Sequence, residues 1–104
     1  MKASIGRIVR YPLTLADAER INKRREDASH SGLAQVNTGA QLHVGNKAEE
    51  GQFYPLLITR VWSEDLVNGQ VFLDGNDTLW VTSSHQAPAG EAERPGFWSE
   101  PPRV

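Results

Sequence analysis

The sequence predicts one small α+β domain dominated by β-structure, with four or five antiparallel strands forming an SH3-like barrel or a partly open roll, and one N-terminal helix. Apolar, β-branched segments follow one another at short intervals in the second half of the chain, and a single amphipathic segment lies near its start. A length of 104 residues leaves room for one core. We expect a compact core over residues 1–88 and an irregular Pro/Gly-rich tail over residues 89–104.

The expected strands are runs of β-branched and aromatic residues bounded by turn residues. They cover Ile5–Tyr11, Gln41–Val44, Gln52–Trp62, Val67–Leu73 and Thr78–Ser83. Pro12 ends the first because it cannot donate to a ladder, and Gly6 within it indicates a bulge or a close approach of the backbone. The segment Asp74–Asp77 predicts a hairpin turn, since Gly and Asn tolerate the positive φ that such turns need.

A helix is expected from Leu15 to about Ala28. Thr14 occupies the N-cap position, and Asp17 three residues later completes a capping-box pattern. The apolar stripe of this helix is narrow and its remaining surface carries arginine and lysine, so we expect a lid on the sheet with the cationic side chains in solvent. The polar, Gly-containing segment Ser29–Ala40 predicts a long loop.

Composition restricts the classes of partner. The net charge is -2 and the pI about 5.9, so the whole molecule does not attract a nucleic-acid duplex. The chain has no cysteine, which excludes disulfides and thiolate ligands. The longest apolar stretch, Phe53–Ile58, is too short to cross a membrane, and we expect no export signal at Met1–Ser4. The sequence predicts a soluble protein.

The sequence lacks the patterns of metal and catalytic sites. His30, His43 and His85 lie in different segments without a metal-binding spacing. The acidic turn at 74–77 begins like a calcium loop but has no glutamate at the twelfth position. Ser84 precedes His85 directly, and neighbours in a strand point to opposite faces. We therefore expect no metal, no cofactor and no enzymatic activity.

Arginine and aromatic side chains are the groups left to bind a ligand. Guanidinium groups bind phosphates in bidentate fashion, and stacking of a base on an aromatic ring contributes about 1–3 kcal/mol. Strand alternation places Trp80 opposite to Leu79 and Val81, towards a second layer or a groove. The candidate ligand-binding residues are Arg7, Tyr11, Arg24, Arg25, His43, Asn46, Asn76, Trp80 and Trp98.

Four stretches, Ile5–Val9, His43–Asn46, Val67–Asp77 and Leu79–Ser83, resemble a family of small proteins from tailed bacteriophages and prophages. Relatives often end in Gly-Thr-Trp-His-Trp-Pro-Glu, where this chain has Gly96–Pro101. The resemblance implies a phage setting, and with it the cytoplasm of an infected bacterial host. It implies no particular activity.

Together these observations favour a counter-defence protein that sequesters a small nucleotide signal, such as a cyclic nucleotide, as a sponge. Arginines would hold its phosphates and tryptophan its base, in a homo-oligomer whose subunit interface could contain the ligand. The alternative is a protein-binding module, such as an inhibitor of a host defence enzyme or a minor virion component, that uses the exposed sheet and the aromatic tail. DNA binding by the basic helix is a third hypothesis, against which the net negative charge argues.

Overall fold

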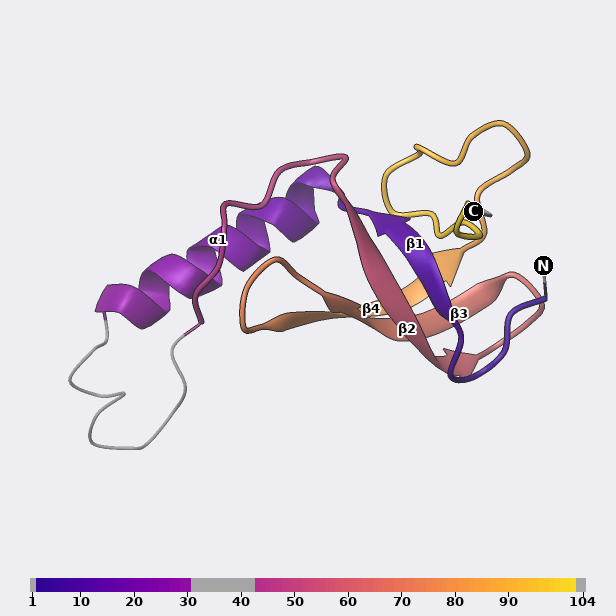
Figure 1. The fold of residues 1–104 in the computed structure, drawn as a ribbon, viewed down its shortest axis with the longest axis horizontal. Coiled ribbons are helices and arrows are strands. Elements are labelled where there is room, and N and C mark those ends of the chain that lie inside the picture. Colours follow the sequence, from indigo (N-terminus) through magenta and orange to yellow (C-terminus); the bar gives the residue numbers. More distant parts are fainter. Residues whose placement is uncertain (1, 31–42, 103–104) are drawn as a thin grey trace.

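The structure, a computed structural model, describes residues 2–30 and 43–102. Within these residues the chain forms one helix, α1 (Leu15–His30), and four strands, β1 (Ile8–Pro12), β2 (Phe53–Val61), β3 (Leu66–Phe72) and β4 (Thr78–His85) (Figure 1). The strands make one antiparallel sheet in the order β1-β2-β3-β4. The predicted α+β, β-dominated fold class is confirmed, and the sheet is not closed into a barrel.

The bounds of β2, β3 and β4 lie close to the predicted ones. The bounds of the first strand differ more from the prediction, Ile5–Tyr11. Gly6 adopts a φ of +91° in a turn before β1, so the strand begins at Ile8 and the predicted bulge within it is wrong. The expected strand over Gln41–Val44 lies partly outside the described residues. Beyond it, Gly45 forms one isolated bridge with Gly75 in the β3–β4 turn. The predicted loop over Ser29–Ala40 lies, from residue 31 on, outside the described residues.

The N-terminus of α1 has the predicted capping box. The Asp17 N–H donates to Thr14 Oγ1 at 2.9 Å, and the Thr14 N–H donates to Asp17 Oδ2 at 3.1 Å. The predicted lid arrangement is wrong, because α1 leaves the end of β1 and extends beyond the sheet (Figure 1). The first half of α1 buries Ala18 and Ile21 in the core. Further along, the Asn22 side chain exchanges two hydrogen bonds with the backbone of Ala48.

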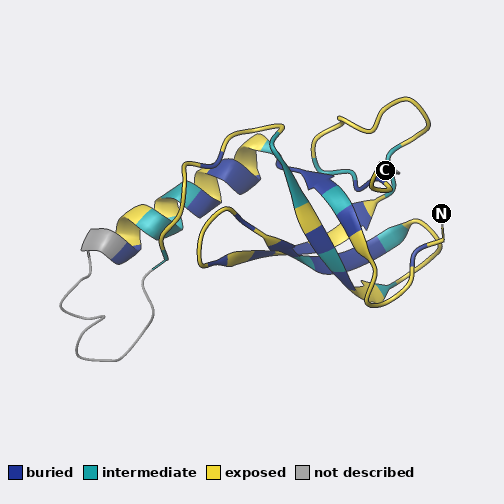
Figure 2. Cartoon of the chain, in the orientation of Figure 1, coloured by how far each residue is buried: buried dark blue, intermediate teal, exposed yellow. Residues whose placement is uncertain are grey.

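The core lies on one face of the twisted sheet. Buried and exposed residues alternate along the strands (Figure 2), as expected for a sheet with one covered face. The buried strand residues include Val9, Tyr11, Leu56, Ile58, Val67, Val71, Leu79 and Val81. At Gly69 a Cβ atom would lie 2.4 Å from the Leu56 side chain, so only glycine allows this close approach between β3 and β2.

The C-terminal segment fills the gap between the two edge strands. The Trp98 side chain is 0% exposed, and its indole N–H donates to the Asp65 carbonyl at 2.8 Å. The Trp98 backbone N–H donates to the carbonyl of His85 at the end of β4, and Ser99 exchanges two backbone hydrogen bonds with Arg10 in β1. Trp98 therefore belongs to the core, and its buried ring leaves no surface for the ligand contact that the sequence predicted.

Replacing Trp98 with alanine removes the largest fully buried side chain of the described residues. We expect Trp98→Ala to lower the free energy of unfolding by about 3–5 kcal/mol, because it leaves a cavity and opens the gap between β1 and β4. Urea denaturation measures the loss. Trp80→Ala is the matched control, since Trp80 is 59% exposed, and should change stability by less than about 0.5 kcal/mol. Equal losses in the two variants would contradict this role of Trp98.

Candidate functional site

The candidate residues fall into separate places. Five of them, Arg24, Arg25, His43, Asn46 and Asn76, lie around the β3–β4 turn. Tyr11 and Trp80 line a hollow between α1 and β4. Arg7 lies before β1, where its Nε donates to Ser4 Oγ at 3.2 Å, and Trp98 is buried in the core. The predicted set does not form one site.

The cluster at the turn is centred on Asp77, whose side chain is 1% exposed. Arg25 binds it in bidentate fashion, with Nε donating to Oδ2 at 3.1 Å and Nη2 to Oδ1 at 2.9 Å. Arg24 donates from Nη2 to Asp77 Oδ2 at 3.0 Å and to the Thr78 carbonyl at 2.9 Å. The expectation that these arginines lie in solvent is wrong, because they tie α1 to the hairpin.

The neighbouring asparagines also hold the fold together. Asn46 Nδ2 donates to Asp74 Oδ2 at 2.7 Å, and the Val44 N–H donates to Asn76 Oδ1 at 2.9 Å. Arg25 Nη1 donates to the Asn46 carbonyl, and His43 Nδ1 lies 3.9 Å from Asp77 Oδ2. These contacts fasten the segment 43–46 to the turn.

Two opposing effects set the pKa of Asp77. Burial favours the neutral acid and would raise the pKa, but the hydrogen bonds from Arg25 and Arg24 favour the carboxylate. The arginines prevail, and the pKa of Asp77 lies below its usual value of 3.8. Asp77 is therefore negatively charged at neutral pH.

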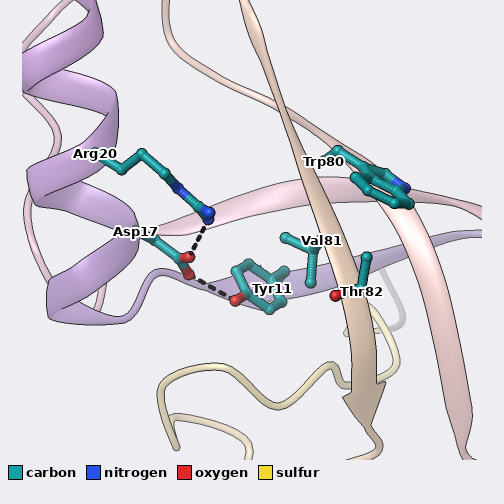
Figure 3. Close-up of a pocket in the computed structure, with 6 residues that line it drawn as sticks. All are labelled: Tyr11, Asp17, Arg20, Trp80, Val81 and Thr82. Carbon is teal, nitrogen blue, oxygen red and sulfur yellow. Dashed lines mark hydrogen bonds and ion pairs between the residues drawn. The ribbon is translucent and has the colours of Figure 1, made fainter.

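A hollow of about 260 Å³ lies between the first turns of α1 and strand β4 (Figure 3). Its lining residues are Tyr11, Asp17, Arg20, Trp80, Val81 and Thr82. The Tyr11 hydroxyl donates to Asp17 Oδ2 at 2.6 Å, and Arg20 Nη2 donates to Asp17 Oδ1 at 3.1 Å. Burial and the neighbouring Asp17 carboxylate raise the pKa of Tyr11, so its phenol stays protonated and serves as a donor.

Arg20 at the rim of the hollow and Trp80 in β4 both have side chains that are exposed to water. The Arg20 side chain is 61% exposed, and Trp80 is 59% exposed. Figure 3 shows the Trp80 ring on the opposite side of the β4 ribbon from Arg20 and Asp17. Among the described residues that line the hollow, Arg20 is the cation, and the sequence did not distinguish it from the other arginines of the helix. A helical repeat shows which side chains share a face, but not which face lies beside β4.

No protein-family model, curated protein or solved structure matches this chain. The resemblance to phage proteins therefore stays a prediction. No helix within residues 2–30 and 43–102 is long and apolar enough to cross a lipid bilayer. In the same part of the chain, no group of three His, Asp or Glu side chains is placed to hold a metal ion.

Asp77→Asn should destabilise the protein, since it leaves Arg25 without its buried carboxylate. We expect a loss of about 3 kcal/mol in the free energy of unfolding, measured by urea denaturation. Because the folded-state pKa of Asp77 is lowered, its contribution is complete above the unfolded-state pKa and is lost as the pH falls through the folded-state pKa. The variant should therefore lose less stability than the wild type below about pH 4.

Asp27→Asn is the control for this prediction. Asp27 lies on the same helix, but its side chain is 62% exposed and pairs with the exposed Lys23. Surface pairs of this kind contribute about 0–1 kcal/mol, so this variant should resemble the wild type at neutral pH. Similar losses in both variants would show that the Asp77 cluster has no special role.

Proposed function

We propose that the protein is a binding protein that captures a small anionic ligand of the nucleotide class in the hollow between α1 and β4. The observation that carries this proposal is the position of Arg20 at the rim, with a largely exposed side chain and an ion pair to Asp17. A guanidinium has further N–H donors in a planar fork, which suits a phosphate group.

The hydrogen bonds around the hollow leave Arg20 as the group that can bind an anion. The lining contains one guanidinium, that of Arg20, and one carboxylate, that of Asp17. The Asp17 carboxylate already accepts hydrogen bonds from the Tyr11 hydroxyl, the Thr14 N–H and Arg20. The exposed Arg20 side chain can therefore bind an anionic group at the rim, although the whole chain carries a net charge of -2.

The size of the hollow favours a small ligand. A volume of about 260 Å³ is near the lower end of pockets that enclose organic molecules, about 300–1,000 Å³. A mononucleotide unit fits this scale, with part of the molecule in water. If the ligand is a signal, capture without conversion would lower its free concentration, which is the action of a sponge. The counter-defence role in an infected bacterium belongs to this proposal and is supported by the sequence resemblance alone.

Isothermal titration calorimetry with a panel of linear and cyclic nucleotides at low salt tests the proposal. We expect at least one nucleotide to bind and Arg20→Gln to weaken it by about 10- to 100-fold, since a charge-assisted hydrogen bond is lost. Lys23→Gln is the matched control, because it removes the same charge from an exposed residue of α1 outside the hollow. The absence of heat with every nucleotide contradicts the proposal, as does an equal loss in the two variants.

A protein-binding module is the second candidate, favoured by the face of the sheet that residues 2–30 and 43–102 leave exposed. The register places Ile8 beside Leu57, Leu57 beside Gln70, and Gln70 beside Trp80, so they form one row across the four strands. Ile8 is 58% exposed, and Phe72, near Trp80 on the same face, is 46% exposed. Adjacent exposed apolar side chains are typical of protein contacts.

If this face joins copies of the chain in the expected homo-oligomer, light scattering after gel filtration should give a mass above the 11.5 kDa of one chain. Phe72→Ser should then shift the mass towards the monomer by removing apolar contact area. Val44→Ser is the control, since Val44 is exposed near the β3–β4 turn and lies outside the sheet. A monomer at every concentration would exclude self-association through this face.

A further inference from the structure

Strand β4 is an edge of the sheet, and its open side is covered at both ends. Near its start, the Thr78 carbonyl accepts a hydrogen bond from Arg24. Near its end, Ser84 Oγ donates to the Gly96 carbonyl at 2.9 Å, and Gln86 forms a parallel bridge with Trp98. Proteins generally protect the edges of their sheets. Between these contacts, Trp80–Thr82 border the hollow.

The register shows which backbone groups face the hollow. The Leu73 N–H donates to the Asp77 carbonyl at 3.3 Å across the turn, which makes Leu73 and Asp77 a hydrogen-bonded pair. Hydrogen-bonded and non-hydrogen-bonded pairs alternate along an antiparallel ladder. The next pair, Phe72 with Thr78, is therefore not hydrogen-bonded. The same holds two residues further on for the pair of Gln70 with Trp80. The N–H and C=O groups of Thr78 and Trp80 point away from β3.

The contact of Thr78 with α1 agrees with this assignment. Its carbonyl accepts from Arg24 of α1, so the open side of β4 at this point is the side that faces the helix. Trp80 follows two residues later, and backbone groups repeat their direction with that period. The N–H and C=O of Trp80 therefore point into the hollow, towards the side where Arg20 and Asp17 lie.

We infer that the main chain of Trp80 recognises the base of the captured nucleotide. Its N–H and C=O are a donor and an acceptor side by side, and they match the edge of a nucleobase, where an acceptor and a donor are adjacent. The inference rests on the proposed function and deepens it: Arg20 holds a phosphate, and the open edge of β4 distinguishes a nucleotide from a sugar phosphate.

The Trp80 ring has no part in this recognition, because it lies on the other side of the β4 ribbon from Arg20 (Figure 3). This separates the main-chain contribution from the side-chain contribution. Trp80→Ala removes the exposed ring and keeps the backbone N–H. Trp80→Pro removes the ring and the N–H, and proline is compatible with an edge position whose N–H makes no ladder hydrogen bond.

Calorimetry with AMP and GMP, their edge-blocked forms N6,N6-dimethyl-AMP and N1-methyl-GMP, and ribose 5-phosphate tests the inference. We expect AMP or GMP to bind the wild type, and Trp80→Ala, which keeps the backbone N–H, to retain more affinity for that nucleotide than Trp80→Pro. The blocked form of that nucleotide, and Trp80→Pro, should each lose about tenfold or more in affinity, because one buried hydrogen-bonding group is left unpaired. Ribose 5-phosphate should bind more weakly than the intact nucleotide.

The outcomes separate this inference from the proposed function. If the blocked nucleotide binds as tightly as the free one, or if Trp80→Ala loses as much affinity as Trp80→Pro, recognition by the main chain is excluded while capture at Arg20 stands. If ribose 5-phosphate binds as tightly as the intact nucleotide, recognition of the base by the main chain is likewise excluded. If neither nucleotide binds, the inference is overturned, and the full panel decides the proposed function. Should Trp80→Pro not fold by circular dichroism, the blocked nucleotides give the answer alone.

Discussion

The gap between β1 and β4 is the constraint on which the rest of this structure depends. Four strands in the order β1-β2-β3-β4 leave an edge at each side of the sheet, and both edges carry backbone groups that need partners. The chain closes part of this gap with its own C-terminal segment, where Trp98 fills the core and Ser99 pairs with Arg10. The part that stays open borders the hollow between Tyr11 and Val81.

A second set of contacts, the ion pairs of Asp77, fixes the position of the helix relative to this gap. Asp77 in the β3–β4 turn binds Arg24 and Arg25, which holds α1 beside the hairpin although the helix extends beyond the sheet. In the first turn of α1, Asp17 caps the helix, accepts a hydrogen bond from the Tyr11 hydroxyl and pairs with Arg20. The position of Arg20 at the hollow thus follows from contacts in the first turn and in the second half of the helix. Both acidic residues serve the fold, and Arg20 is the cation that stays exposed beside the hollow.

Residues of the same type have different roles in this molecule, as two of the arginines and two of the tryptophans show. Arg25 is 9% exposed and serves the fold, whereas Arg20, four residues from Arg24 on the same helix, lies at the rim of the hollow. The ring of Trp98 is sealed in the core, and the ring of Trp80 is exposed on the far side of its strand. A ligand in the hollow meets a guanidinium and a strand edge, so its hydrogen-bonding pattern matters more than stacking.

The sequence by itself determined the α+β class, the helix with its Thr14–Asp17 capping box, and the meander of β2, β3 and β4, because caps, turns and periodicity act within a few residues. Only the tertiary structure decided that the sheet stays open, that Arg24 and Arg25 bind Asp77, and that Trp98 is buried while Trp80 is exposed. Arg25 and Asp77 lie 52 residues apart, and no local pattern specifies such a pair. The direction of a backbone N–H at a strand edge depends likewise on which strand pairs with which, and that is settled only when the whole sheet assembles.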